Sequence, residues 1–362
     1  MVRSNAPLLA ASVLALAPAT ARAAPEQVYQ GTVGTAPVVM MLSEDKAEVF
    51  GQYFYLRSRL DIDLSGSVRG QTIDLASRVT GDKLHLTRSG TTLSGTLTTA
   101  KAKRLPVSLR PAGVAENLPA DLPPKLSGYE RWHLTGLTLT AQQAETINGK
   151  TIRWYREPLS GIRLFRIERG YAAPALAAVN HTLARNQWQD VSAWFGCIGY
   201  EGGPGTDVAE AQKPWLGTNH ISYLWNASWS CAGAAHPDFA TVGYSFDMHT
   251  GRELRLDDLL PFGPAPAEDS DAWYGYRGKR FAPGVVTLLK RYHPAEMTKP
   301  GRDDEDGCDY SDPDVWDFPG WALSDKGLWL GATFARVQRA CDAPDWAILP
   351  WSALGLKPGE QP

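Results

Sequence analysis

The sequence predicts an antiparallel all-β meander or barrel over residues 24–110, followed by an α+β region over residues 128–362 with an antiparallel sheet and packed helices. Three observations predict this fold class. Short apolar-alternating runs separated by glycines come first, a proline-rich stretch follows, and strand-like and helix-like periods alternate in the remainder. With 362 residues, 43% of them hydrophobic and 21% charged, the chain is long enough for about two domains.

The first residues are typical of a secretory signal peptide. Arg3 gives a positive start, residues 8–16 form an apolar core, and residues 21–23 read A-R-A, a typical cleavage signal. We therefore expect residues 1–23 to be removed and the mature protein to reach the periplasm or the extracellular space. No stretch approaches the about 20 apolar residues that a membrane-spanning helix needs, so no transmembrane segment is expected.

The charge balance bears on the class of partner. Removal of the signal takes away Arg3 and Arg22, which moves the formal net charge from −3 to −5. A mildly acidic protein has no electrostatic reason to bind nucleic acid or an anionic membrane. A basic partner would be tolerated or weakly favoured.

Four cysteines in an exported chain predict two disulfides, for which three pairings are possible. We favour Cys197–Cys231 and Cys308–Cys341, because each pair is nearest in sequence and brackets one structural segment. Each bond would close a loop of about 35 residues, which contributes roughly 3–4 kcal/mol in the chain-entropy account. The absence of a C-x-x-C motif argues against redox catalysis and against a zinc ribbon.

The meander is predicted from evenly spaced runs with turn residues between them, which suit an up-and-down barrel or a sandwich. Successive hairpins need no crossover helices, so the strands should be antiparallel. The runs are TAPVVMML, EVFGQYFYL, LDIDLSG, QTIDLAS, KLHLTRSG and TTLSGTLTT. The aromatic cluster of Phe50, Tyr53, Phe54 and Tyr55 could line a ligand face, although core packing with one exposed rim is the favoured interpretation.

Residues 111–127 are polar and rich in proline, which predicts a semi-rigid linker and a domain boundary. The region after the linker mixes both periods. Its predicted strands are 151–157, 161–170, 220–230, 327–334 and 345–354, its predicted helices are 173–196 and 283–294, and residues 241–263 are predicted to form a hairpin. In the strand over residues 220–230, aromatic and aliphatic side chains alternate with polar ones, which indicates one buried face.

Sequence motifs in this region resemble a known family. The motifs are Ala-Ala-His-Pro at 234–237, Phe-Asp-Met-His-Thr-Gly-Arg-Glu-Leu-Arg-Leu-Asp-Asp-Leu at 246–259, and Ile-Leu-Pro-Trp-Ser-Ala-Leu at 348–354. Roughly residues 150–356 resemble the C-terminal domain family shared by the lysozyme-sensing anti-sigma factor RsiV and the peptidoglycan deacetylase PdaC. The motif residues are His236, Pro237, Asp247, Gly251, Leu256, Asp257 and Pro350.

The resemblance implies extracellular binding near the cell wall, with lysozyme or peptidoglycan as partner, and it implies no catalytic set. The chain departs from the relatives in two ways. We expect no transmembrane helix or cytoplasmic anti-sigma segment and no deacetylase domain, so signalling of the RsiV kind is not expected.

The histidines carry no recognisable chemistry. All seven are scattered, and none shows the spacing of a metal-binding motif. His220 and His236 flank one predicted strand and its turn, close in sequence to Asp238. The favoured interpretation is that both orient backbone through hydrogen bonds, so that loss of His236 would impair folding or partner binding rather than a chemical step.

An acidic run over residues 301–314 is the best metal candidate, with Asp304, Asp306 and Asp309 as ligands of an irregular calcium site. The run does not fit an EF-hand loop, because Arg302 and Pro313 stand where that loop needs acids. A solvated loop pinned through Cys308 is the favoured alternative, since blocks of like charge are usually solvated. No other cofactor is expected.

The chain has thirteen tryptophans. Trp188, Trp273, Trp316 and Trp321 fall in loop-like or amphipathic settings, where they could stack on sugar rings or anchor a protein partner, with core packing as the alternative.

Our first functional hypothesis is an exported, non-catalytic binding module of the cell envelope, for lysozyme or peptidoglycan. A second hypothesis is a cell-wall glycan hydrolase that uses carboxylates at Asp238, Asp247 or Asp257. A third is a structural or scaffold component of the envelope.

Overall fold

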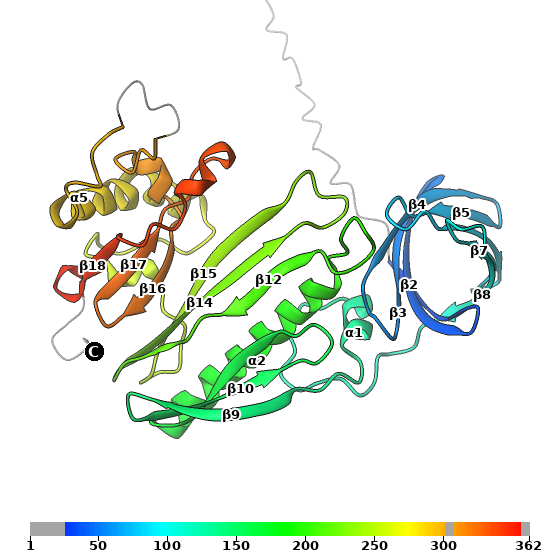
Figure 1. Ribbon diagram of the computed structural model, residues 1–362, viewed down its shortest axis with the longest axis horizontal. Helices are drawn as coiled ribbons and strands as arrows, with labels where there is room; N and C mark the ends of the chain where they lie inside the picture. The colour runs from blue at the N-terminus through cyan, green and yellow to red at the C-terminus, as the bar shows by residue number, and fades with distance from the viewer. Residues whose placement is uncertain (1–25, 301–306, 356–362) are drawn as a thin grey trace, which may run out of the picture.

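The computed structural model describes residues 26–300 and 307–355. Its first eight strands form a closed antiparallel barrel (Figure 1). The predicted signal peptide, residues 1–23, lies outside the described residues. The strands are β1 (Gln27–Val33), β2 (Ala36–Asp45), β3 (Glu48–Tyr55), β4 (Ile62–Arg69), β5 (Thr72–Ala76), β6 (Lys83–Ser89), β7 (Thr92–Thr98) and β8 (Arg104–Pro111).

Each barrel strand pairs with its neighbour in sequence, and β1 pairs with β8 to close the sheet. The predicted antiparallel meander is thus confirmed, and of the two architectures that its pattern allowed, the structure has the barrel. Alternate side chains fill the interior, as a small barrel requires. Within the aromatic cluster, Tyr53 lies in the barrel core, Phe54 is buried outside the barrel against Tyr129, and Phe50 is exposed.

Residues 112–127 contain no helix or strand, and α1 (Gly128–Leu134) begins directly after them. The capping box of Ser127 and Glu130 sets this helix start, because each side chain accepts a hydrogen bond from the other residue's backbone N–H. The other helices are α2 (Ala173–Phe195), α3 (Leu256–Leu259), α4 (Asp271–Tyr276) and α5 (Ala282–Tyr292), with a π-helical turn at Arg277–Phe281 and short 3-10 helices at Pro313–Trp316, Arg336–Cys341 and Trp351–Ala353.

The described residues also form three smaller antiparallel sheets. The first contains β9 (Thr140–Ile147), β10 (Lys150–Arg156) and β11 (Arg163–Arg169); the second contains β12 (Thr206–Ala211), β13 (Trp215–Leu216), β14 (His220–Trp229) and β15 (Asp238–Asp247); the third contains β16 (Gly320–Ser324), β17 (Gly327–Gly331) and β18 (Ile348–Pro350).

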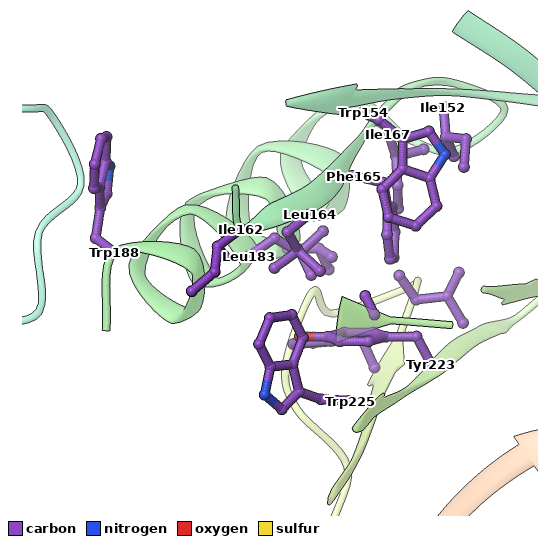
Figure 2. Close-up of a cluster of buried hydrophobic side chains, with 14 of the residues drawn as sticks. Ile152, Trp154, Ile162, Leu164, Phe165, Ile167, Leu183, Trp188, Tyr223 and Trp225 are labelled. Carbon is purple, nitrogen blue, oxygen red and sulfur yellow. The ribbon is translucent and has the colours of Figure 1, made fainter. Parts of the chain in front are cut away.

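The long helix α2 packs between the first and second of these sheets (Figure 1). Leu183 of the helix meets Phe165 of β11 and Tyr223 of β14 in one apolar core, which Figure 2 shows in close-up. The predicted helix over 173–196 is confirmed, with Pro174 in its first turn, where the missing N–H has no partner to lose.

The two faces of β14 follow the predicted alternation. Ile221, Tyr223 and Trp225 are buried toward α2. On the other face, Ser222 Oγ lies 2.7 Å from Ser245 Oγ and accepts a hydrogen bond from the backbone N–H of Leu323 at 3.0 Å. The third sheet therefore covers the face of β14 and β15 opposite to α2.

Two predicted elements are shorter than the sequence suggested. The return arm of the hairpin over 241–263 is not a strand; it makes a single bridge, Phe246 with Glu253, and then enters α3. The predicted strand over 345–354 is reduced to β18, because a 3-10 helix follows at once. Apolar residues alternate along both segments and pack into the core. Neither segment has a neighbouring strand to pair with along its whole length, so neither is a strand throughout.

Both disulfides form between the favoured partners. The Cα atoms of Cys197 and Cys231 are 5.0 Å apart, and those of Cys308 and Cys341 are 5.6 Å apart. None of the helices in the described part of the chain has the length and apolar character needed to cross a bilayer.

Gly243 marks the tightest approach between the second and third sheets, because a Cβ atom at this position would overlap the carbonyl oxygen of Trp321. We predict that Gly243→Ala lowers the free energy of unfolding by about 2–4 kcal/mol, since neither backbone can move without breaking sheet contacts. Chemical denaturation measures this loss. Gly113→Ala, where nothing lies within 4 Å of the added Cβ, is the matched control and should change stability little. Equal stability of both variants would contradict the packing described.

Candidate functional site

A hollow lies on the outer face of β2, β3 and β4, and we call it the barrel-side groove. Its volume is about 750 Å³. Met41, Phe50 and Gln52 form its floor, and Tyr200 and Gly233, from the turns after α2 and after β14, form its wall. Phe50 is 52% exposed and Tyr200 is 60% exposed, so two aromatic rings face solvent across the groove.

Polar side chains accompany the aromatic rings in the barrel-side groove. Asp63, Arg78 and two serines line it, and Gln52 Nε2 donates a hydrogen bond of 2.8 Å to Asp63 Oδ1. The groove therefore combines apolar ring faces with hydrogen-bond donors and acceptors. That combination suits an uncharged ligand that has both an apolar face and a polar rim.

A second hollow of about 420 Å³ adjoins the groove on the side of α1, because Met41 and Gln52 line both, and we call the two together the joined groove. Its polar wall is built around Asp61. Tyr129 donates a hydrogen bond of 2.6 Å to Asp61 Oδ1, and His133 Nε2 lies 2.9 Å from the same oxygen. Burial, reinforced by the Asp61 carboxylate, raises the pKa of the Tyr129 phenol well above its ordinary value, so the phenol stays a donor.

Contacts around Asp61 also dock the barrel on the helices. Its backbone N–H donates to the carbonyl of Phe195 at the end of α2, with an N···O distance of 2.9 Å. The ring of His133 stacks on Phe54 of β3 with 4.0 Å between centroids. The joined groove thus lies between elements that are held in a fixed relation.

The turns that wall the groove are held by the Cys197–Cys231 disulfide. Two isolated bridges, Ile198 with Pro204 and Gly199 with Cys231, add to the constraint. Ile198 and Ala232 on the two sides of the disulfide pack into the core of the barrel. This disulfide-linked corner therefore fixes the position of Tyr200 over the barrel face.

His236 lies beyond this corner, in the turn between β14 and β15, and its side chain is exposed. Its Nδ1 lies 3.3 Å from the carbonyl oxygen of the adjacent Pro237. Gly233, with φ +90°, makes the turn possible, as its small-residue setting suggested. The backbone contact expected of His236 is therefore present, and it reaches the residue next in sequence.

His220 and His236 do not meet. They flank β14 at opposite ends, and β14 spans ten residues, or about 30 Å at roughly 3.3 Å per residue. His220 is buried, with its ring stacked near Trp351 at 6.5 Å between centroids. The structure therefore assembles no histidine pair, and it places neither histidine in the barrel-side groove.

Asp238 and Asp247, two of the carboxylates considered for hydrolysis, stand at the two ends of β15. Asp238 forms an ion pair with Arg339, whose Nη2 also donates to the carbonyl of Phe239 at 2.7 Å. Asp247 Oδ1 accepts a hydrogen bond of 2.6 Å from the backbone N–H of His249 in the following turn. A glycosidase needs its two carboxyl groups within about 5–10 Å, which this separation excludes for the pair.

Asp257, the third carboxylate, is buried and fully engaged. It accepts a hydrogen bond of 3.1 Å from Trp273 Nε1 and one of 3.0 Å from Arg277 Nη1. The guanidinium of Arg277 stacks on the ring of Phe281, with 3.8 Å from Cζ to the centroid. Burial lowers the pKa of Arg277, and the Asp257 carboxylate opposes that shift. The pair is a structural tie between α3 and the π-helical turn.

Of the metal candidates, Asp304 and Asp306 lie outside the described residues. Asp309 accepts hydrogen bonds from the backbone N–H and the hydroxyl of Ser311, at 3.1 and 2.6 Å. Within residues 26–300 and 307–355, no group of three or more His, Cys, Asp or Glu side chains is arranged to hold a metal ion.

The tryptophans singled out by sequence pack in the core: Trp188, Trp273 and Trp316 are buried, and Trp321 is half-buried. Three others, which the sequence did not distinguish, line a separate hollow of about 310 Å³ between α2, β12 and β14. These are Trp194, Trp225 and Trp229, and Asp190 lies among them. The alternation in β14 predicts that Trp225 and Trp229 share a face, but no local pattern predicts that Trp194 joins them.

Neither a scan against protein-family models nor a search of curated proteins finds a match for this chain.

We predict that Asp257→Asn lowers the free energy of unfolding by about 3 kcal/mol or more, because it leaves the Arg277 guanidinium buried without its counter-ion. His236→Ala, at an exposed position, should change stability by less than about 0.5 kcal/mol. Urea denaturation of both variants beside the wild type makes the comparison. A stable Asp257→Asn variant, or a strongly destabilised His236→Ala variant, would show that the structural roles assigned to these residues are wrong.

Proposed function

We propose that this chain is an exported, non-catalytic binding protein of the cell envelope, and that its barrel-side groove holds a segment of wall glycan. The observation that carries the proposal is the pair of exposed aromatic rings, Phe50 and Tyr200, facing one groove together with Gln52 and Asp63. A sugar ring has C–H faces that stack on aromatic rings and hydroxyl groups that pair with amide and carboxylate side chains.

The shape of the groove supports a chain-like ligand. The hollow over the barrel face adjoins the hollow beside α1 at Met41 and Gln52, and their volumes are about 750 and 420 Å³. Single drug-sized ligands fill about 300–1,000 Å³, so the joined groove has room for more than one sugar unit. The glycan strand of peptidoglycan is such a chain.

The state of the carboxylates supports binding rather than hydrolysis. Asp63 is bonded to Gln52 and Asp61 to Tyr129, and Asp238, Asp247 and Asp257 hold the fold elsewhere. The two disulfides are compatible with export. The resemblance of the later region to the RsiV and PdaC domain family points to the same wall environment, with lysozyme as the other partner that the family suggests.

The proposal is tested with two probes, an N-acetylglucosamine tetramer in calorimetric titration and purified insoluble peptidoglycan in a sedimentation assay. We predict that Phe50→Ala and Tyr200→Ala each weaken binding by about tenfold, since each removes one stacking face. Tyr274→Ala is the matched control, because Tyr274 is 51% exposed and lies outside the groove. Its binding should equal that of the wild type.

Two outcomes would contradict the glycan proposal. If neither probe binds, or if the groove variants bind as well as the control, the glycan proposal fails. If the wild type instead co-elutes with lysozyme and both groove variants do the same, the protein-binding hypothesis replaces it.

A further inference from the structure

The hollow between α2, β12 and β14 has its own chemistry, and we call it the tryptophan hollow. Trp194 comes from the last turns of α2, and Trp225 and Trp229 come from the face of β14 that is turned toward the helix. Ala209 of β12 and the Cys197–Cys231 disulfide complete the lining. The walls are therefore almost entirely apolar, with three indole rings in a volume of about 310 Å³.

Asp190 is the one ionisable group among the lining residues. It is half-buried, and within the described residues no hydrogen bond or ion pair reaches its carboxyl group. Burial alone raises the pKa of this carboxyl group to about 7, and no protein cation opposes the shift. Carboxylates withdrawn from water are normally paired with a cation or a hydrogen-bond donor. Within the described residues, the Asp190 carboxylate has neither.

The two features together define the missing partner. An apolar pocket wall selects a ligand with an apolar body, and the negative faces of indole rings attract a cation. An unpaired carboxylate at the same place attracts a positive charge as well. A guanidinium or metal ion would need more polar partners than the hollow offers, whereas an ammonium carried on methyl or methylene groups would not.

We infer that the tryptophan hollow binds an organic ammonium group, with its charge against Asp190 and its alkyl groups against Trp194, Trp225 and Trp229. A tetraalkylammonium ion and the end of a lysine side chain share this chemistry and fit a hollow of this size. The inference does not rest on the proposed glycan function, because the tryptophan hollow shares no lining residue with the hollow over the barrel face and only Ala193 with the hollow beside α1.

The test uses tetramethylammonium, whose charge does not change with pH, in calorimetric titration of the full chain at pH 8. Tert-butanol is the neutral probe of similar shape, and N-acetyl-lysine methylamide distinguishes a protein side chain from a free ammonium ion. We predict that Asp190→Asn and Trp229→Ala each weaken tetramethylammonium binding by about tenfold or more. Asp190→Asn should leave any binding of tert-butanol unchanged.

The pH profile separates a direct role of Asp190 from a merely structural one. Because only the carboxylate attracts the cation, wild-type affinity should fall as the pH is lowered through about 7, the pKa of Asp190. Tyr223 and Tyr244 face the same region, but burial raises their pKa values, so they stay neutral throughout. Glu253, which acts on both tyrosines, and Arg185, which acts on Glu253, are the other charged groups nearby. Glu253→Gln is therefore the control, and it should keep the midpoint.

Folding of the main variant is checked by thermal melting. The folded state binds a proton at Asp190 more tightly than the unfolded chain does, because the pKa is raised from 3.8 to about 7. The wild type therefore loses stability as the pH rises between these two values, and Asp190→Asn should melt at a higher temperature than the wild type at pH 8. Tetramethylammonium should raise the melting temperature of the wild type only.

Two results would overturn the inference. One is the absence of binding to the wild type by both tetramethylammonium and the lysine amide at millimolar concentration, and the other is equal binding of these probes to the wild type and to a folded Asp190→Asn variant. Binding of the lysine amide but not of tetramethylammonium would support the inference and assign the ammonium group to a lysine side chain.

Discussion

The Cys197–Cys231 disulfide is the constraint on which both concave sites depend. It joins Cys197, two residues after the end of α2, to Cys231, two residues after the end of β14, and so fixes the turns at both places. One side of the corner presents Tyr200 to the barrel-side groove, and both cysteines line the tryptophan hollow. Closing a loop of this length removes about 3–4 kcal/mol of chain entropy from the unfolded state. Ile198 and Ala232 then anchor the corner in the barrel core.

The acidic residues of the two kinds of site differ in whether a cationic side chain lies beside the carboxylate. Asp257 is paired with Arg277, and Asp238 is paired with Arg339, so each carboxylate has a counter-ion within the chain. Such pairs hold segments that are distant in sequence, since Arg339 reaches across to the start of β15. Asp190 has no such partner within the described residues, and burial raises the pKa of its carboxyl group to about 7. A carboxylate withdrawn from water needs a counter-ion. Asp257 and Asp238 find theirs within the chain, whereas we infer that Asp190 takes its own from a ligand.

Local pattern predicted much of the fold. The two-residue period and the turn glycines predicted the strands from β2 to β7, and Pro174 with helical spacing predicted α2. Closure of the barrel by β1 and β8 was left open, because pairing between the first and last strands is a long-range contact that no local pattern records. The domain boundaries, the resemblance to the RsiV and PdaC family and the functional hypotheses stay predictions.

The candidate sites were harder to foresee than the fold, because each combines segments far apart in the chain. Phe50 shares a groove with Tyr200, and Asp190 shares a hollow with Trp229, only once the corner has formed. The motif residues had clearer signals but turned out to build turns: Asp247 accepts from the turn backbone, and the side chain of His236 is exposed. The small residues and the proline around His236 form a turn, and the exposed imidazole ring has no catalytic role in this account.

The central claim is that one disulfide-linked corner shapes both sites, and hydrogen–deuterium exchange tests it most directly. The Cys197→Ser/Cys231→Ser double variant is compared with the Cys308→Ser/Cys341→Ser double variant, whose bond lies outside both hollows. We predict faster exchange over residues 197–205 and 230–236, and over β3 and β4 beneath the groove, in the first variant only. Unchanged exchange in these segments, with the barrel still folded, would contradict the account.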